Sequence, residues 1–183
     1  MKVVFLGAPG SGKGTQAQIL CDRRGWRHIS TGDLLRQAVR DETPLGKQAK
    51  EAMDRGNLVA DDIILALIEE TLEGMGSADG FVLDGFPRTQ VQARGLDDLL
   101  AGRDEQLDRV ILLQVPAEEV MKRLSARGRQ DDTEETVRNR LAVYERQTAP
   151  LIGYYEEGGR LARIDGVGGI PEIQERIGSA LAD

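Results

Sequence analysis

The feature that most constrains this chain is a glycine-rich stretch, GAPGSGKGTQ, at residues 7–16. It follows the apolar run KVVFL, which is typical of a strand buried in a parallel sheet, and it leads into a segment with helical periodicity. In such a place backbone N–H groups can surround phosphate oxygens, and the positive end of the helix dipole adds to the attraction. A plain glycine-rich turn needs no lysine here, so Lys13 favours a phosphate-binding loop.

One position departs from the general pattern of these loops, G-x-x-x-x-G-K-[ST]. Gly7, Gly12 and Lys13 match it, but Gly14 stands where a hydroxyl residue is expected, and Thr15 follows one place later. The residues of the loop alone do not decide whether the phosphate-binding motif is broken or is the variant of a particular family.

The rest of the chain alternates apolar runs with helical patterns. This alternation predicts an α/β fold of the P-loop NTPase type, a three-layer sandwich in which helices flank a five-stranded parallel sheet. Between about residues 30 and 60 only helices are expected, which indicates a helical insertion. Asp61 or Asp62 is expected to cap one helix, and Asp132 with Glu135 fits a capping box for another. The expected strands are 2–7, 27–30, 80–85, 109–115 and 160–165, and the expected helices are 15–24, 30–40, 44–56, one ending at Leu72, 89–100, 116–127, 131–147 and 171–182.

Composition narrows the classes of function. The chain has 183 residues, which suits one domain with insertions, and its net charge of −7 argues against a general nucleic-acid surface. No run approaches the roughly 18 apolar residues of a membrane span, and the N-terminus does not resemble a signal peptide, so we expect a cytoplasmic protein that does not bind membranes. The single cysteine, Cys21, excludes an internal disulfide and is expected in the core, and the single histidine, His28, is expected to be structural.

Asp84 is a candidate for metal chemistry. It ends the apolar run FVLD, and in parallel sheets ligands gather where strands end. In phosphate-loop proteins an acid at this place handles Mg²⁺. A turn residue before Gly85 is the alternative, but the nearby phosphate loop favours the magnesium role.

Several arginines have no evident local reason to be present. Arg123 and Arg138 each follow a glutamate four residues earlier, which predicts ordinary helix pairs, whereas Arg140 has no acid three or four residues away. Arg88 sits in the tight turn GFPRT at the end of a strand. We therefore expect a cationic clamp for anions, formed by Arg36, Arg88, Arg127, Arg129 and Arg140, with Arg36 the least clear because Asp33 can pair with it.

Together these features predict phosphoryl transfer between two anionic ligands. The loop and Lys13 suffice for one triphosphate, and the arginines exceed what that ligand needs. No side chain stands out as a general base. A phosphate acceptor needs none, because its second pKa is about 6 and it is already a nucleophile at neutral pH. Positioning and charge neutralisation can then supply the catalysis.

Four segments carry a resemblance to a known family: GAPGSGKGTQ, ISTGDLLR, GFVLDGFPRTQVQA and RQDDTEETVRNRL with the following YERQTAPLIGYY. In order, and over essentially the whole chain, they resemble adenylate kinases. The resemblance implies the reversible reaction ATP + AMP = 2 ADP with Mg²⁺, in a monomer. GKGTQ is the normal loop of this family, so Gly14 is no defect and Thr15 takes the hydroxyl position.

The resemblance also implies roles for individual residues. Asp84 would hold Mg²⁺ through water. The catalytic residues would be Lys13, Arg88, Arg127, Arg129 and Arg140. ATP would contact Gly10, Ser11, Gly12, Lys13, Gly14, Thr15, Arg127 and Gly168. AMP would contact Thr31, Arg36, Asn57, Leu58, Val59, Gly85, Phe86, Pro87, Arg88, Gln92, Arg129 and Arg140.

The same resemblance divides the chain into domains. Residues 30–59 would form a mobile AMP-binding domain and residues 126–132 a short lid. Residues 1–29, 60–125 and 133–183 would form the core. Since the lid lacks the longer insert that some relatives carry with a zinc site, zinc is not expected.

Three alternatives stay open at this point. A pyrimidine nucleoside monophosphate kinase would share every phosphate-handling motif, but Thr31 and Gln92 match the adenine-selective pattern. A nucleotide switch or sensor would leave the arginines without a purpose, and the base-reading motif N-K-x-D of guanine switches is absent from the sequence. A kinase acting on a hydroxyl would need a base. The base of the triphosphate donor is left undecided.

Overall fold

The computed structural model describes residues 1–75, 80–128 and 133–182, and within them the chain forms a five-stranded sheet in the order β2-β3-β1-β4-β5. Every neighbouring pair of strands is parallel. Because β1 lies between β3 and β4, the connections leave it in both directions, which makes its carboxyl end the place where ligands of such sheets bind. The strands are β1 (Lys2–Leu6), β2 (Arg27–Ser30), β3 (Phe81–Asp84), β4 (Arg109–Gln114) and β5 (Leu161–Asp165).

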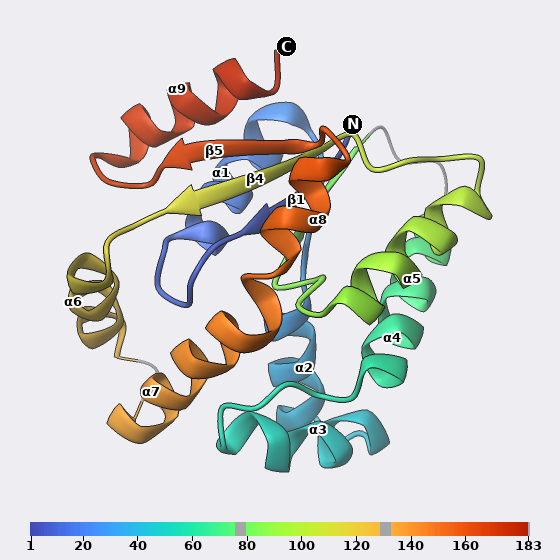
Figure 1. The fold of residues 1–183 in the computed structure, drawn as a ribbon. Coiled ribbons are helices and arrows are strands. Elements are labelled where there is room, and N and C mark those ends of the chain that lie inside the picture. Colours follow the sequence, from blue (N-terminus) through green and yellow to red (C-terminus); the bar gives the residue numbers. More distant parts are fainter. Residues whose placement is uncertain (76–79, 129–132, 183) are drawn as a thin grey trace.

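Helices cover both faces of the sheet (Figure 1). Side chains alternate along β1, so that Val3 and Phe5 join one apolar cluster and Val4 and Leu6 the other. The first cluster packs against α1 (Lys13–Arg24) and α9 (Ile170–Ala180). The second packs against α4 (Asp61–Glu73), α5 (Gln90–Ala101) and α8 (Leu151–Glu157). The expected three-layer sandwich with a five-stranded parallel sheet is therefore confirmed.

The expected helical insertion lies between β2 and α4. It consists of α2 (Thr31–Arg40) and α3 (Pro44–Asp54), at the end of the molecule away from β5 and α9 (Figure 1). The two helices approach closely at Gly46, where an added Cβ would lie 2.0 Å from the carbonyl oxygen of Ala38. After β4 the chain forms α6 (Ala117–Arg127), α7 (Glu134–Val143) and a π-helical turn over Tyr144–Thr148. None of the helices in the described ranges is long and apolar enough to cross a bilayer.

Two predicted helix caps were wrong. Neither Asp61 nor Asp62 caps α4, whose N-cap is Ala60. The capping box of Asp132 with Glu135 is replaced by Thr133, whose hydroxyl accepts from the N–H of Thr136, so α7 begins at Glu134. Asp132 itself lies outside the described residues. The helix expected over 131–147 ends at Val143 and continues as the π-helical turn, and α8 was not predicted.

Candidate active site

A cleft of about 730 Å³ opens at the carboxyl ends of β1 and β3. It is bounded by the glycine-rich loop, by α2, by the residues after α3 and by one face of α7. Most of the residues expected to bind nucleotides line it, although they come from segments far apart in the sequence. These are Gly10, Gly12, Lys13, Gly14, Thr15, Thr31, Arg36, Asn57, Leu58, Val59, Asp84, Gly85, Pro87, Arg88, Gln92 and Arg140.

The glycine-rich loop is held in shape partly by its own lysine. The Nζ of Lys13 donates to the carbonyl oxygens of Gly7 at 2.7 Å and Ala8 at 3.0 Å. Gly14, the residue that departs from the general motif, faces Asp84, and an added Cβ would lie 3.1 Å from the carboxylate Oδ2. A larger residue at position 14 would push that carboxylate away. The variant loop thus lets the acid at the end of β3 lie close to the phosphate-binding turn.

The carboxyl group of Asp84 is kept ionised by its neighbours. Burial alone would raise its pKa, but His28, Lys13 and Arg88 together lower the pKa below its ordinary value. The ring Nε2 of His28 lies 3.8 Å from the Asp84 Oδ2, and its Nδ1 is 3.0 Å from the Oε1 of Gln18. Asp84 therefore offers a charged carboxylate to the cleft at neutral pH.

Arg88 is the most deeply placed cation of the cleft. Its Nε donates to the carbonyl of Gly85 at 2.7 Å, and its own carbonyl accepts from the hydroxyl of Thr148 at 2.9 Å. Burial lowers the pKa of Arg88; the charge of Asp84 opposes this, and the charges of Arg140 and Arg36 add to it. Like charges are therefore gathered in one buried place, and an anion between them would relieve their repulsion. Arg36 also pairs with Asp33, at 2.6 Å between Nη2 and Oδ1, as its sequence position suggested.

The wall formed by the turn after β3 requires a glycine. Gly85 has a left-handed φ of 79°, and an added Cβ would lie 2.9 Å from the Nη2 of Arg88 and 3.0 Å from the Oγ1 of Thr31. Thr31 is buried and donates to the Gly85 carbonyl at 2.9 Å. The turn is thus packed directly against the start of α2.

Gln92 is held in place by two hydrogen bonds. Its Oε1 accepts from the backbone N–H of Arg88 at 2.8 Å, and its Nε2 donates to Asp61 Oδ1 at 2.8 Å. The same Asp61 oxygen accepts from the hydroxyl of Thr89 at 2.9 Å. One hydrogen of the Gln92 amide is left to donate elsewhere. Asp61 therefore orients a residue of the cleft, a role that its position at a helix start concealed.

Not every expected site residue lines the cleft. Ser11 is buried within the loop, Phe86 is buried in the core, and Gly168 lies in the connection between β5 and α9. Arg127 ends α6, and nothing is described of its side chain. Arg129 lies outside the described residues.

Arg123 makes more contacts than the sequence predicts. The expected pair with Glu119 is present at 2.8 Å, but the other two guanidinium nitrogens are also engaged. Nη1 donates to the carbonyl of Ser11 at 3.2 Å, and Nη2 to the carbonyl of Gly166 at 3.0 Å. Arg123 therefore ties α6 to the glycine-rich loop and to the connection between β5 and α9.

Comparison with known proteins agrees with this geometry. The sequence model of the family described as Adenylate kinase matches residues 5–160. The chain is 52% identical to an adenylate kinase of Xanthomonas campestris pv. campestris (strain 8004) over an alignment of 185 positions, which covers 99% of each chain. It is 56% identical to adenylate kinase 1 of Synechocystis sp. over 164 residues, which cover 90% of this chain and 88% of the relative. An adenylate kinase of Stenotrophomonas maltophilia (strain K279a) is 50% identical, with 99% of each chain covered.

Proposed function

The chain belongs to the adenylate kinase family, and we propose that its cleft holds ATP and AMP with their phosphates facing each other. As a member of this family it is a phosphotransferase that catalyses ATP + AMP = 2 ADP. The proposal concerns which of its own residues perform each part of the reaction. The observation that carries it is the cleft that brings Lys13 and Asp84 together with the arginines Arg36, Arg88 and Arg140.

The donor end is assigned to the glycine-rich loop. Residues Gly10 to Thr15 present backbone N–H groups to the phosphates of ATP, and the Lys13 ammonium leaves its two carbonyl partners to follow the transferred phosphoryl group. Gly168 contributes a backbone contact to the adenine, and Arg127 lies beside ATP.

The acceptor end is assigned to the opposite wall. Arg36 and Arg88 clamp the phosphate of AMP, and Arg129 and Arg140 bridge the two phosphate chains during transfer. Thr31, Gln92 and the backbone from Asn57 to Val59 surround the adenine. The turn Gly85, Phe86 and Pro87 completes this wall.

A magnesium ion fits the donor set of the cleft. The ion favours one or two carboxylates together with phosphate oxygens and water, and Asp84 supplies an ionised carboxylate beside the loop. When bound, the ion neutralises charge on the phosphates. Thr15, at the start of α1, supplies the hydroxyl on the same side.

Closure completes the proposed mechanism. Residues 30–59 form the mobile AMP-binding domain, and residues 126–132, of which 129–132 lie outside the described residues, form a short lid, around a core of the remaining chain. Their closure over both nucleotides excludes water, which would otherwise accept the phosphoryl group. We further propose that the protein is a monomer, because residues of one chain line the proposed sites of both nucleotides. A cytoplasmic location is also proposed.

A nucleotide panel tests the reaction and its acceptor together. Purified protein is mixed with Mg·ATP and, separately, with AMP, CMP, UMP or GMP, and the nucleotides are separated by chromatography. We expect ADP to form with AMP and its formation to stop when Mg²⁺ is chelated. Formation of CDP or UDP would instead agree with the proposed arginine clamp but would contradict the proposal that Thr31 and Gln92 select adenine. ATP binding without transfer to any acceptor would overturn the reaction.

Replacement of Arg123 tests the donor end. We expect Arg123→Ala to raise the KM for ATP about tenfold or more. The substitution removes the hydrogen bonds to the carbonyls of Ser11 and Gly166, and a hydrogen bond to a charged group contributes about 1.5–3 kcal/mol. Arg123→Lys should restore little of the affinity for ATP, since a lysine ammonium cannot reach the three acceptors that the planar guanidinium contacts. Steady-state kinetics with each nucleotide varied in turn checks this. A KM for ATP equal to that of the parent would show that the helix pair with Glu119 is the only role of Arg123.

A further inference from the structure

One face of α7 holds the end of α3 in place. Thr136, Asn139 and Arg140 lie on this face because they are separated by three and four residues. All three contact the segment from Asp54 to Asn57, which is more than eighty residues away in the sequence. That segment leads directly into the backbone that borders the acceptor side of the cleft.

The central contact is made by the side-chain amide of Asn139. Its Nδ2 donates to the carbonyl of Arg55 at 2.6 Å and to the Oδ1 of Asn57 at 2.8 Å. A carbonyl only accepts, so the nitrogen of Asn139 must face this way, and Asn57 must present its oxygen. Both hydrogens of the Asn139 amide are therefore committed to the segment beside the cleft.

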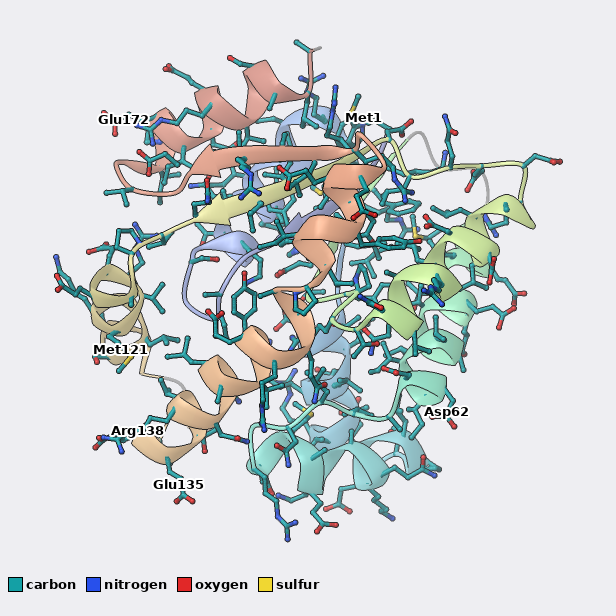
Figure 2. The ribbon with its side chains drawn as sticks, viewed as in Figure 1. Met1, Asp62, Met121, Glu135, Arg138 and Glu172 are labelled. Carbon is teal, nitrogen blue, oxygen red and sulfur yellow. The ribbon has the colours of Figure 1, made fainter. Side chains whose placement is uncertain are left out.

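Two neighbouring contacts restrict the same segment. The hydroxyl of Thr136 lies 3.5 Å from the carbonyl of Asp54. Gly56 has a left-handed φ of 72°, and an added Cβ would lie 2.9 Å from the Thr136 carbonyl and 3.1 Å from the Cγ of Arg140. The stem of a clamp arginine thus packs against the segment that Asn139 holds. Arg138 lies on the same helix but extends outward from the molecule (Figure 2).

We propose that Asn139 is a positioning residue for the acceptor pocket, fixing Asn57 and the backbone after it against the helix that carries Arg140. The inference rests on the proposed role of residues 57–59 in binding AMP. It adds that the helix following the lid, and not the insertion alone, sets the distance between the adenine wall and the arginine clamp.

The test compares two substitutions at Asn139. Asn139→Ala should raise the KM for AMP about threefold to tenfold, the range expected when a hydrogen bond of ordinary net strength is lost. Asn139→Asp is nearly the same size but replaces the donating amide with a carboxylate, which has no hydrogen to donate to the carbonyl of Arg55 and repels it. It should raise the KM for AMP further. In both variants the KM for ATP should stay near that of the parent.

Three further measurements separate positioning from a general structural role. Asn57→Ala removes one acceptor, so its effect on the KM for AMP should not add to that of Asn139→Ala in the double variant. Arg138→Ala, on the outward face, should leave both KM values unchanged. Melting temperatures should stay close to that of the parent.

The outcomes also separate this inference from the proposed function. AMP affinity measured by calorimetry does not depend on turnover, so parental affinity in both Asn139 variants would overturn the inference. A parallel rise of both KM values with a lower melting temperature would also overturn it. Absence of phosphoryl transfer in the parent chain would instead overturn the function.

Discussion

Arg88→Ala should lower kcat for ADP formation by about 10³-fold or more, which is the lower end of what an arginine contributes to phosphoryl transfer. The guanidinium is partly buried in the cleft, at the junction of the two proposed nucleotide sites, where solvent weakens its attraction for phosphate oxygens less than at an exposed position. The change should not unfold the protein, because burial of the charge and the repulsion from Arg140 and Arg36 together outweigh the attraction to Asp84, as the lowered pKa of Arg88 indicates. Initial rates with saturating Mg·ATP and AMP check the catalytic effect.

The controls for this variant are thermal and positional. The melting temperature should stay within about 3 °C of the parent, which corresponds to about 1 kcal/mol in a chain of this size. Arg138→Ala removes an arginine whose side chain is 76% exposed and paired with Glu134, and it should retain nearly full activity. Near-normal AMP turnover in Arg88→Ala would refute the clamp. A severe defect in Arg138→Ala would show that local pairing is a poor guide to which arginines act.

The three central strands β1, β3 and β4 could be predicted because their burial on both faces produces continuous apolar runs in the sequence. A parallel strand covered by helices reads as a continuous apolar run, and Val3 to Leu6, Val82 and Leu83, and Val110 to Leu113 are all buried. The helix starts were harder to predict. Asp61 is a good cap by residue type, yet its carboxylate binds Thr89 and Gln92 from another helix. The carboxylate therefore makes tertiary hydrogen bonds in place of the helix cap that the local pattern predicts.

Site residues that belong to a sequence motif could be predicted. Site residues that act through long-range contacts could not. Asp84 ends β3, Arg88 lies in the turn that follows, and Lys13 follows the loop after β1. A parallel sheet brings the carboxyl ends of these two strands together. Arg123 has a sufficient partner four residues away, so nothing in the sequence indicates a second contact with Ser11, 112 residues distant. Asn139 is similar, because its partners Arg55 and Asn57 are 84 and 82 residues away.

The role of His28 could be predicted only in part from its residue type and local sequence. It was expected to be structural, and its contact with Gln18 agrees with that expectation. Its ring also lies beside Asp84 and is one of the groups that lower the pKa of that carboxyl. The pairing of β2 with β3 places Ser30 opposite Asp84 and His28 opposite Val82, and this register could not be predicted from the short run RHIS. Position in the sheet, rather than residue type, brought the histidine to the cleft.

Lys13→Met should lower kcat by about 10²- to 10³-fold, the loss found when one preorganised donor to a developing negative charge is removed. Methionine is close to lysine in length, so it can fill the same space beside the loop, while the ammonium and its two hydrogen bonds to Gly7 and Ala8 are lost. Lys13→Arg should recover little of the activity. The two carbonyls of Gly7 and Ala8 hold a compact ammonium at 2.7 and 3.0 Å, and a planar guanidinium is wider and directs its hydrogens differently.

The matched control for this pair is Lys122→Met, which removes an equal charge from a side chain that is 81% exposed on α6. Initial rates in both directions of the reaction give the comparison. The overall equilibrium fixes the ratio of the forward and reverse kcat/KM values, so a loss of transition-state stabilisation lowers both values by the same factor. A loss in Lys13→Met that appeared only as a higher KM for ATP would assign Lys13 to ground-state binding. A parental kcat in Lys13→Met would show that Lys13 has no part in the transfer step, and the arginines and the magnesium ion would then have to neutralise the charge that develops between the two nucleotides.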